Sequence, residues 1–391
     1  MKHTPKVLLV AGHDVNARID LICRLRSEYV TLAAGSSTTI YEDFATENIE
    51  YHTYPALSNG NLFQNIRAVL ALYRLFRKLR PDIVHTFDTK PNIWARLAAR
   101  LARVPIIIGT VTGLGILYTN SRLPTRITRT VYEFLQKLSS NLATATIFQN
   151  RDDYNQFINA KIVRPEKAHT ILGSGVATSH FAKEQASAAS QSNLRREFNI
   201  CEDGVVICMI ARLIRTKGVM DYAQIAALIV HENPCAKFLL IGPYEASDMD
   251  SLSATELDSL QRSVIWTGKR NDIRDILSIS DVFVLPSAYR EGIPRVLLEA
   301  ASMSLPLVAT DAPGCREIVI DEQNGYLVQP SDVNELTIKI NRLIQDTALR
   351  IKFGEQSRHL AVAAFDLSIV SQKTDQLYKD LLNKHSLQKL I

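Results

Sequence analysis

The chain has 391 residues, of which 46% are hydrophobic and 22% charged, a composition typical of a soluble protein with roughly two or three domains. No stretch approaches the roughly 18 uninterrupted apolar residues of a membrane span, so no spanning helix is expected. The five cysteines show no C-x-x-C spacing and no partnering histidines, so we expect reduced thiols and no zinc site.

The net charge of +5 hides an asymmetry along the chain. Residues 1–180 hold 22 Lys and Arg against 13 Asp and Glu, whereas the remainder holds 23 against 27. A basic N-terminal part favours an anionic partner, such as a membrane surface, a lipid diphosphate or a nucleic acid. We do not expect nucleic acid, because interleaved aromatic residues and a recognised module are missing. The apolar run at 7–11 is too short for a signal peptide, so we expect a cytoplasmic protein.

The first part of the chain alternates predicted strands with predicted helices. This alternation predicts a mostly parallel, doubly wound α/β sheet, whose ligands bind at the carboxyl ends of the strands. The predicted strands are 6–11, 29–34, 50–54, 82–85, 106–110 and 143–149, and the predicted helices are 16–27, 61–79, 90–102 and about 125–138.

The predicted helix 61–79 is basic on one face. Arg67, Arg74 and Lys78 cluster there, and apolar residues such as Leu72 and Phe76 share the opposite face. Such a helix suits an anionic membrane surface, and it equally fits a core-facing helix with a solvated side; further arginines in the same part of the chain favour the membrane.

Residues 183–193, rich in Ala, Ser and Gln, are the best candidate for a linker. The alternation restarts after them, with strands predicted at 205–210, 238–241, 264–267 and 281–285 and a helix from Val219. Arg212 and Lys217 follow the first of these strands. Two cations at the carboxyl end of a strand could hold a diphosphate, although a solvated basic loop is the alternative.

A helix predicted to begin at Pro294 offers an anion site. Proline fits the first helical position, and the backbone N–H groups of the first turn, for example those of Arg295 and Val296, attract phosphate together with the helix dipole. Glu291 precedes this helix and Glu299 lies on it, so that two carboxylates flank the anion site. The arrangement suits a ligand with a polar head, a diphosphate and a second polar ring.

These residues carry a resemblance to a known family. Residues 291–299 read Glu-Gly-Ile-Pro-Arg-Val-Leu-Leu-Glu, and the motifs at 305–310, 314–319 and 324–328 follow in order. The pattern resembles the retaining glycosyltransferases of family four, and it covers most of residues 200–330 and, more weakly, the N-terminal half. The resemblance implies a GT-B fold, with two Rossmann-like domains that face a crevice. The domains would be 1–182 for the acceptor and 194–365 for the nucleotide sugar, with the last helix, about 366–391, returning to the first domain.

The resemblance also implies roles for individual residues. Glu291 would contact the hydroxyls of the donor sugar, Glu299 would hold the ribose, and Arg212 and Lys217 would grip the donor diphosphate, with Glu291, Arg212 and Lys217 forming the catalytic group. The other residues implied in donor binding are Gly292, Ile293, Arg295, Val296, Arg270, Asn271, Gly12, Thr112 and Ser174.

Several of these positions leave alternatives open. Thr112 stands where many relatives have a histidine, and Asn271 or Asp272 could instead cap a helix. Ser174 lies in a Gly-Ser-Gly run that fits a plain turn as well as a ligand contact. His85 and Lys90 could bind the phosphate of an acceptor, whereas His85 could equally bond to its own loop.

Asp248 and Asp250 form a D-x-D, a signature of metal-dependent glycosyltransferases of a different fold. They lack the expected strand context, so we interpret them as residues at a helix start and expect no metal and no cofactor.

The resemblance thus implies an enzyme that transfers a sugar, by subgroup likeness an N-acetylhexosamine, from a UDP-sugar to a polyprenyl diphosphate-linked saccharide with retention of configuration. It would act in surface polysaccharide assembly, peripherally on the inner face of the plasma membrane. The alternatives are a nucleotide-sugar epimerase of the same architecture and a non-catalytic two-domain sugar-binding protein.

Overall fold

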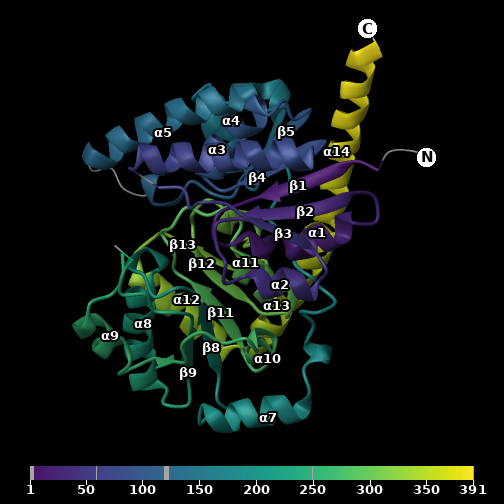
Figure 1. The fold of residues 1–391 in the computed structure, drawn as a ribbon. Helices are drawn as coiled ribbons and strands as arrows, with labels where there is room; N and C mark the ends of the chain where they lie inside the picture. Colours follow the sequence, from purple (N-terminus) through teal and green to yellow (C-terminus); the bar gives the residue numbers. More distant parts are fainter. Residues whose placement is uncertain (1–3, 59, 119–122, 249, 391) are drawn as a thin grey trace. The chain divides into compact units, whose positions relative to one another are not determined.

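Two parallel β-sheets, each with its own helices, form the frame of the protein (Figure 1). The computed structural model describes residues 4–58, 60–118, 123–248 and 250–390. The chain divides into a first unit, Met1–Gly173 with Leu367–Ile391, and a second unit, Ser174–Asp366. The last helix therefore belongs to the first unit.

The first unit contains a seven-stranded sheet in the order β3-β2-β1-β4-β5-β6-β7. All its strand pairs are parallel, and the central strands are buried on both faces, which is why they read as nearly continuous apolar runs. The strands are β1 (Lys6–Val10), β2 (Val30–Gly35), β3 (Glu50–Thr53), β4 (Ile83–Phe87), β5 (Ile106–Val111), β6 (Ala145–Phe148) and β7 (Ala168–Thr170).

Helices cover both faces of this sheet. On one face, α3 (Leu62–Leu79) and α4 (Pro91–Leu101) pack against Leu8 and Val10 of β1, and α5 (Leu123–Leu142) lies beside α4 (Figure 1). On the other face, α1 (Ile19–Leu25) and α14 (Leu367–Leu390) pack against the alternate residues of β1. The remaining helices of the unit are α2 (Tyr41–Thr46) and α6 (Arg151–Asn159).

The second unit contains a six-stranded parallel sheet in the order β10-β9-β8-β11-β12-β13. Its strands are β8 (Val206–Ile210), β9 (Lys237–Ile241), β10 (Ile265–Trp266), β11 (Val282–Leu285), β12 (Leu307–Thr310) and β13 (Gly325–Val328). Its helices are α7 (Ala188–Glu197), α8 (Val219–Glu232), α9 (Ala254–Leu260), α10 (Ile273–Ser278), α11 (Arg295–Ser302), α12 (Val333–Gln345) and α13 (Thr347–Ala364).

Three expectations are corrected by these elements. The predicted helix 16–27 is a 3-10 turn, η1 (Val15–Arg18), followed by the short α1. The predicted linker 183–193 overlaps α7, whose Ser190 hydroxyl donates a hydrogen bond to Asp275 of α10 at 2.9 Å. The second unit also begins at Ser174 and not after residue 182, because Arg358 of α13 donates to the carbonyls of Thr178 and Phe181.

Among the described residues, no helix combines the length and the apolar character that crossing a bilayer would require.

Candidate functional site

The loops at the carboxyl edge of the second sheet touch one another through two glycines. Gly218, which follows the 3-10 turn η5 (Arg215–Lys217), has φ +75°, and a Cβ there would lie 2.1 Å from the carbonyl oxygen of Pro286. Gly314 has φ +87°, and a Cβ there would lie 1.8 Å from the carbonyl oxygen of Gly292. The loops that follow β8, β11 and β12 therefore form one continuous surface at the edge where parallel sheets bind their ligands.

The helix that was expected to begin at Pro294 begins one residue later. Pro294 has ψ 119°, outside the helical range, and is the N-cap of α11. Its carbonyl accepts the first hydrogen bonds of the helix, from the N–H groups of Leu297 at 3.0 Å and Leu298 at 3.3 Å. The first turn of α11 thus directly follows Gly292 and Ile293, whose side chain is buried, so that Ile293 can present only its backbone to a ligand.

Lys217 and Glu291 form an ion pair across two of these loops. Both side chains are mostly buried, and the Lys217 Nζ lies 5.2 Å from the centre of the Tyr289 ring. The sequence assigned these residues to separate parts of a ligand, the diphosphate and the sugar. The structure places the cation and the carboxylate next to each other, just before the first turn of α11.

Arg212 lies on the same edge and is held by the D-x-D. Its Nη1 is 3.0 Å from Asp248 Oδ2, while Asp250 Oδ2 accepts hydrogen bonds from the N–H of Thr216 at 2.8 Å and from its hydroxyl at 2.5 Å. The interpretation of this motif as a helix start is wrong, because Ser253 caps α9 with a capping box. The two aspartates instead position the loop that carries the predicted cations.

Asn271 and Glu299 line the same cavity, with a volume of about 250 Å³, which also includes His180, Phe181 and Arg274. The Glu299 side chain is buried and accepts a hydrogen bond from Arg295 Nε at 3.0 Å. The family resemblance implied that Glu299 holds the ribose of the donor and that Asn271 takes part in donor binding. The structure brings these two donor-binding candidates together at one cavity.

The guanidinium of Arg270 is engaged in ion pairs rather than in the donor-binding role that was expected for it. Its guanidinium pairs with Asp272 at 2.6 Å and with Glu197 of α7 at 2.6 Å, and these two carboxylates raise its pKa. Asp272 is the N-cap of α10, but its side chain makes no capping hydrogen bond because it binds Arg270. Arg270 therefore fastens α7 to the loop after β10, and the prediction that it binds the donor is not supported by this geometry.

The first unit contributes a second group of candidates at the carboxyl ends of β1, β4 and β5. A cavity of about 250 Å³ is lined by Gly12, His13, Lys90 and Asp88, among others. Lys90 Nζ donates to the carbonyl of Leu57 at 3.0 Å. Gly12 and Lys90 thus share one cavity, as their positions after two neighbouring strands suggested.

Asp88 is a residue of this group that the sequence reasoning did not single out. Its Oδ1 accepts from the Thr112 hydroxyl at 3.1 Å, and its Oδ2 accepts from the Gly12 N–H at 3.5 Å. Burial and the neighbouring Asp14 raise its pKa, while Arg18 and the two hydrogen bonds act in the opposite direction. Its backbone has φ +67°, a conformation that is uncommon outside glycine and that merits a functional explanation. The available signal was an acidic residue immediately after a buried strand.

His85 does not belong to this cavity. It is 1% exposed, its Nδ1 is 2.6 Å from the Tyr378 hydroxyl of α14, and its Nε2 is 2.7 Å from Thr110 Oγ1 of β5. Both ring nitrogens are therefore used inside the first unit, a geometry that does not support the prediction that His85 binds an acceptor. Odd and even residues of a strand point to opposite faces, and this histidine faces α14.

Comparison with known proteins identifies the family. The model described as Glycosyl transferases group 1 matches residues 190–360, and the model described as Glycosyl transferase 4-like matches residues 6–150. The chain belongs to the glycosyltransferases. Together the two models cover both sheets except strand β7, and they leave out residues 151–189, which include Ser174.

Two curated relatives cover most of the glycosyltransferase. It is 29% identical over 345 residues to the UDP-Gal:alpha-D-GlcNAc-diphosphoundecaprenol alpha-1,3-galactosyltransferase of Escherichia coli, covering 87% of this chain and 86% of that protein. It is 27% identical over 319 residues to the N,N'-diacetylbacillosaminyl-diphospho-undecaprenol alpha-1,3-N-acetylgalactosaminyltransferase of Campylobacter jejuni, covering 81% and 82%.

Solved structures confirm that the glycosyltransferase has the GT-B fold. A glycosyltransferase from Rickettsia africae superposes with a TM-score of 0.79 at 19% identity, covering 97% of this chain and 99% of that one. HepE of Anabaena in complex with UDP superposes with a TM-score of 0.78 at 20% identity, covering 96% and 100%.

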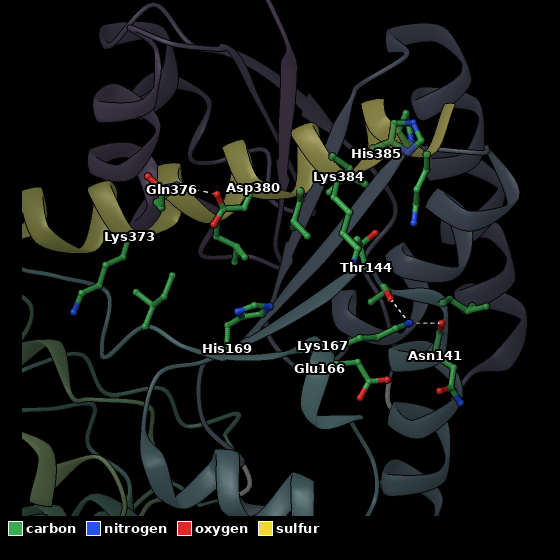
Figure 2. Close-up of a pocket in the computed structure, with 18 of the residues that line it drawn as sticks. Asn141, Thr144, Glu166, Lys167, His169, Lys373, Gln376, Asp380, Lys384 and His385 are labelled. Atoms are coloured by element: carbon green, nitrogen blue, oxygen red, sulfur yellow. Dashed lines mark hydrogen bonds between the residues drawn. The ribbon is translucent and has the colours of Figure 1, made fainter. Parts of the chain in front are cut away.

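A larger cavity, of about 850 Å³, lies elsewhere in the first unit of the glycosyltransferase (Figure 2). It is lined by Thr144 before β6, by His169 of β7 and by Lys384 of α14, and Lys167 reaches the carbonyls of Asn141 and Ala143 beside it at 3.0 and 2.7 Å. None of the predicted site residues lines this cavity. Residues that precede β5 and β6 lie at the amino edge of the sheet, so the cavity is separate from the candidate site.

Proposed function

We propose that this glycosyltransferase moves a sugar from a UDP-sugar to a polyprenyl diphosphate-linked saccharide, with retention of configuration and without a metal ion. The contact between Lys217 and Glu291, just before α11, is the observation that supports the proposal most directly, because a cation beside a hydrogen-bonding carboxylate suits the linkage between a diphosphate and a sugar. The cavity of Asn271 and Glu299 would take the nucleoside. The names of the two relatives and the UDP complex of HepE support this ligand class.

The proposed chemistry needs stabilisation of a departing diphosphate. The bond between the sugar C1 and the β-phosphate oxygen breaks, and a bond from C1 to the acceptor oxygen forms on the same face of the ring. The proton of the acceptor hydroxyl passes to the departing phosphate oxygen, so no side chain need act as nucleophile. Lys217, Arg212 and the first turn of α11 would stabilise the negative charge that develops on the leaving group.

The donor sugar and the location complete the proposal. One relative is named for the transfer of N-acetylgalactosamine and the other for that of galactose. We assign an N-acetylhexosamine to this enzyme, and a screen of UDP-sugars with a short polyprenyl-diphosphate acceptor, read by product mass, would distinguish it from a hexose. An acceptor anchored in lipid requires a peripheral position on the inner face of the plasma membrane, where cytoplasmic UDP-sugars are supplied.

A pair of alanine variants tests the site. We expect Lys217→Ala and Glu291→Ala each to lower kcat/KM for transfer at least about 100-fold, since each removes a group that acts on the sugar–diphosphate linkage. Lys339→Ala is a matched control, because the Lys339 Nζ also lies over a tyrosine ring, that of Tyr326, in the same unit. Full activity in a folded Lys217→Ala protein would refute the proposal. Conversion of the UDP-sugar without an acceptor would indicate an epimerase, and sugar binding that ignores UDP would indicate a binding protein.

Removal of metal ions tests the proposal that transfer needs no metal ion. Asp248 and Asp250 already bind Arg212 and Thr216, and no group of at least three metal-ligating side chains occurs in the part of the chain that the structure describes. We expect transfer in excess EDTA to stay within about twofold of the untreated rate, because Lys217 and Arg212 supply the positive charge. A rate that falls with EDTA and recovers with magnesium would show that a metal takes part.

A further inference from the structure

Helix α5 carries a stripe of large apolar side chains that face solvent. The stripe consists of Leu123, Ile127, Val131, Phe134 and Leu138, at intervals of four, four, three and four residues, which places all of them on one face. These side chains are between 50% and 69% exposed. The opposite face of α5 is buried through Tyr132, Gln136 and Ser139. A helix that covers a sheet normally presents polar side chains to water, so this exposed apolar face needs a partner.

The first half of α3 adds to the same surface. Leu62, Phe63, Ile66 and Leu70 are between 46% and 70% exposed. Helix α4 packs against both α3 and α5, so that the three helices form one layer on the sheet (Figure 1). In the described part of the second unit, the exposed large apolar residues are scattered over three helices. They are Leu228 on α8, Ile338 on α12, and Ile351 and Val362 at opposite ends of α13, a distribution that is usual for protein surfaces.

The charges around the stripe identify the partner. The sequences of α3 and α4 contain no Asp or Glu, and Glu133 is the single acidic residue of α5. Exposed basic side chains flank the stripe on α5, and others lie within or after the apolar half of α3. They are Arg126 and Lys137 on α5, and Arg67, Arg74, Arg77 and Lys78 on α3. A second copy of the chain would bring like charges together, whereas an anionic lipid surface complements both the charge and the apolar stripe.

We propose that the α5 stripe, with the first half of α3, inserts into the surface of an anionic bilayer and holds the enzyme there. The stripe runs over about 22 Å at 1.5 Å per residue, and its helix would lie in the plane of the surface with its apolar face among the acyl chains. This inference rests on the proposed function, because it places the enzyme where a polyprenyl-linked acceptor is anchored. The sequence predicted a membrane contact on the basic face of helix 61–79. The proposal instead assigns most of this contact to α5, and adds apolar side chains to the electrostatic attraction.

Vesicle binding by the full chain tests the proposal. The vesicles contain phosphatidylcholine alone or mixed with phosphatidylglycerol, and the variant is Ile127→Ser with Phe134→Ser. We expect this variant to bind the anionic vesicles at least about tenfold more weakly than the wild type, because two large apolar side chains no longer enter the bilayer. The matched control, Ile338→Ser with Ile351→Ser, replaces apolar residues of the second unit that are 65% and 58% exposed, and should bind within about twofold of the wild type.

The salt dependence separates the two components. At about 0.5 M salt, where the screening length is only a few ångströms, binding through the arginines should weaken while binding through the stripe remains. The serine variant should then lose the residual binding that the wild type keeps. Equal binding of the stripe variant and the wild type to anionic vesicles would overturn the proposal. So would sedimentation that shows a dimeric wild type and a monomeric stripe variant, because the stripe would then join two copies.

The assay of transfer keeps this inference separate from the proposed function. We expect the stripe variant to melt at the temperature of the wild type and to use a short, water-soluble acceptor at the wild-type rate. With a long-chain acceptor in vesicles, its rate should fall in parallel with its binding. If the wild type transfers sugar from no UDP-sugar, the proposed function fails, while the vesicle measurement still decides what the stripe binds.

Discussion

His85 and Asp88 are three residues apart at the end of β4, yet burial has opposite consequences for them. Burial favours the neutral form of each group, which lowers the pKa of the histidine to about 3 and raises that of the aspartate. Arg18 and Arg96 also lower the pKa of His85, while Asp14 also raises that of Asp88. His85 is therefore a neutral residue of the core. Asp88 is a carboxyl group that lines a cavity, where burial disfavours its charged form.

The pKa of His85 predicts a dependence of stability on pH. Below pH 6.5 the unfolded chain binds a proton at this histidine, but the folded protein does not until about pH 3, so stability is lost as the pH falls through that range. The loss amounts to at most about 1.4 kcal/mol per pH unit. His85→Gln removes this contribution, so its deficit relative to the wild type should shrink from pH 7.5 to pH 5.5. Urea unfolding at several pH values measures it, and a constant deficit would contradict the prediction.

The position of Asp88 predicts a loss of activity without a loss of stability. Asp88→Asn removes a buried negative charge beside Asp14 and keeps a side-chain oxygen that can accept from the Thr112 hydroxyl. We expect kcat/KM for transfer to fall at least about tenfold, with a melting temperature equal to or above that of the wild type. A variant with full activity, or one that melts many degrees lower, would show that Asp88 serves the fold alone.

At this scale the sequence could predict a site residue only where a motif marked it. Glu291 and Glu299 were predicted from the spacing of their motif and Lys217 from its position after a strand, and the structure places all three in the second unit. His85 and Asp88 could not be told apart, because both stand at the end of one strand. Which of them faces the core depends on the packing of α14, a segment nearly 300 residues away in the chain.

The loops of the candidate site approach one another closely at Gly218 and Gly314. A single added methyl group there should therefore destabilise the site strongly. Gly314→Ala would place a Cβ 1.8 Å from the Gly292 carbonyl oxygen, so the loops after β11 and β12 must separate. We expect a lower melting temperature and at least about tenfold weaker binding of UDP by calorimetry, because the loop before α11 is displaced.

Gly268→Ala is the matched control for that variant. Gly268 has a similar φ of +71°, but nothing lies within 4 Å of an added Cβ. It should cost only the strain of the left-handed backbone, about 1 kcal/mol. Equal destabilisation by the two alanines would show that the contact with Gly292 has no energetic weight.

Whole strands were predictable from their apolar runs, whereas the structure of one polar segment was not. Most of the strands named in advance occur within one or two residues of their predicted limits, because a parallel strand buried on both faces is a clear apolar run. Residues 183–193 were misread because Ala, Ser and Gln suit a linker and a helix alike. The Ser187 side chain accepts a hydrogen bond from the Ser190 N–H and so caps the N-terminus of α7. Composition alone does not reveal this local contact.

For the whole molecule, the resemblance in one motif correctly predicted the two-sheet architecture, while the exposed stripe of α5 was missed. The sequence predicted the helix 125–138 without stating which of its faces is buried. An apolar stripe usually marks the buried side of a helix, so the sequence alone offered no reason to expect it on the surface. Only the structure shows that Tyr132 and Gln136 are the buried residues, so that the apolar side chains face outward.

Because each unit has its own sheet and helices, the molecule should unfold in two steps that a ligand affects differently. UDP is proposed to bind residues of the second unit, Ser174–Asp366. At a hundredfold excess over its Kd, UDP should stabilise that unit by about 2.7 kcal/mol and raise its transition by roughly 5–10 °C in scanning calorimetry. The transition of the first unit is recognised by the part of its pH dependence that His85→Gln removes. If UDP instead raised only this pH-dependent transition, the nucleotide would bind the first sheet, and the assignment of the donor to the loops around α11 would be wrong.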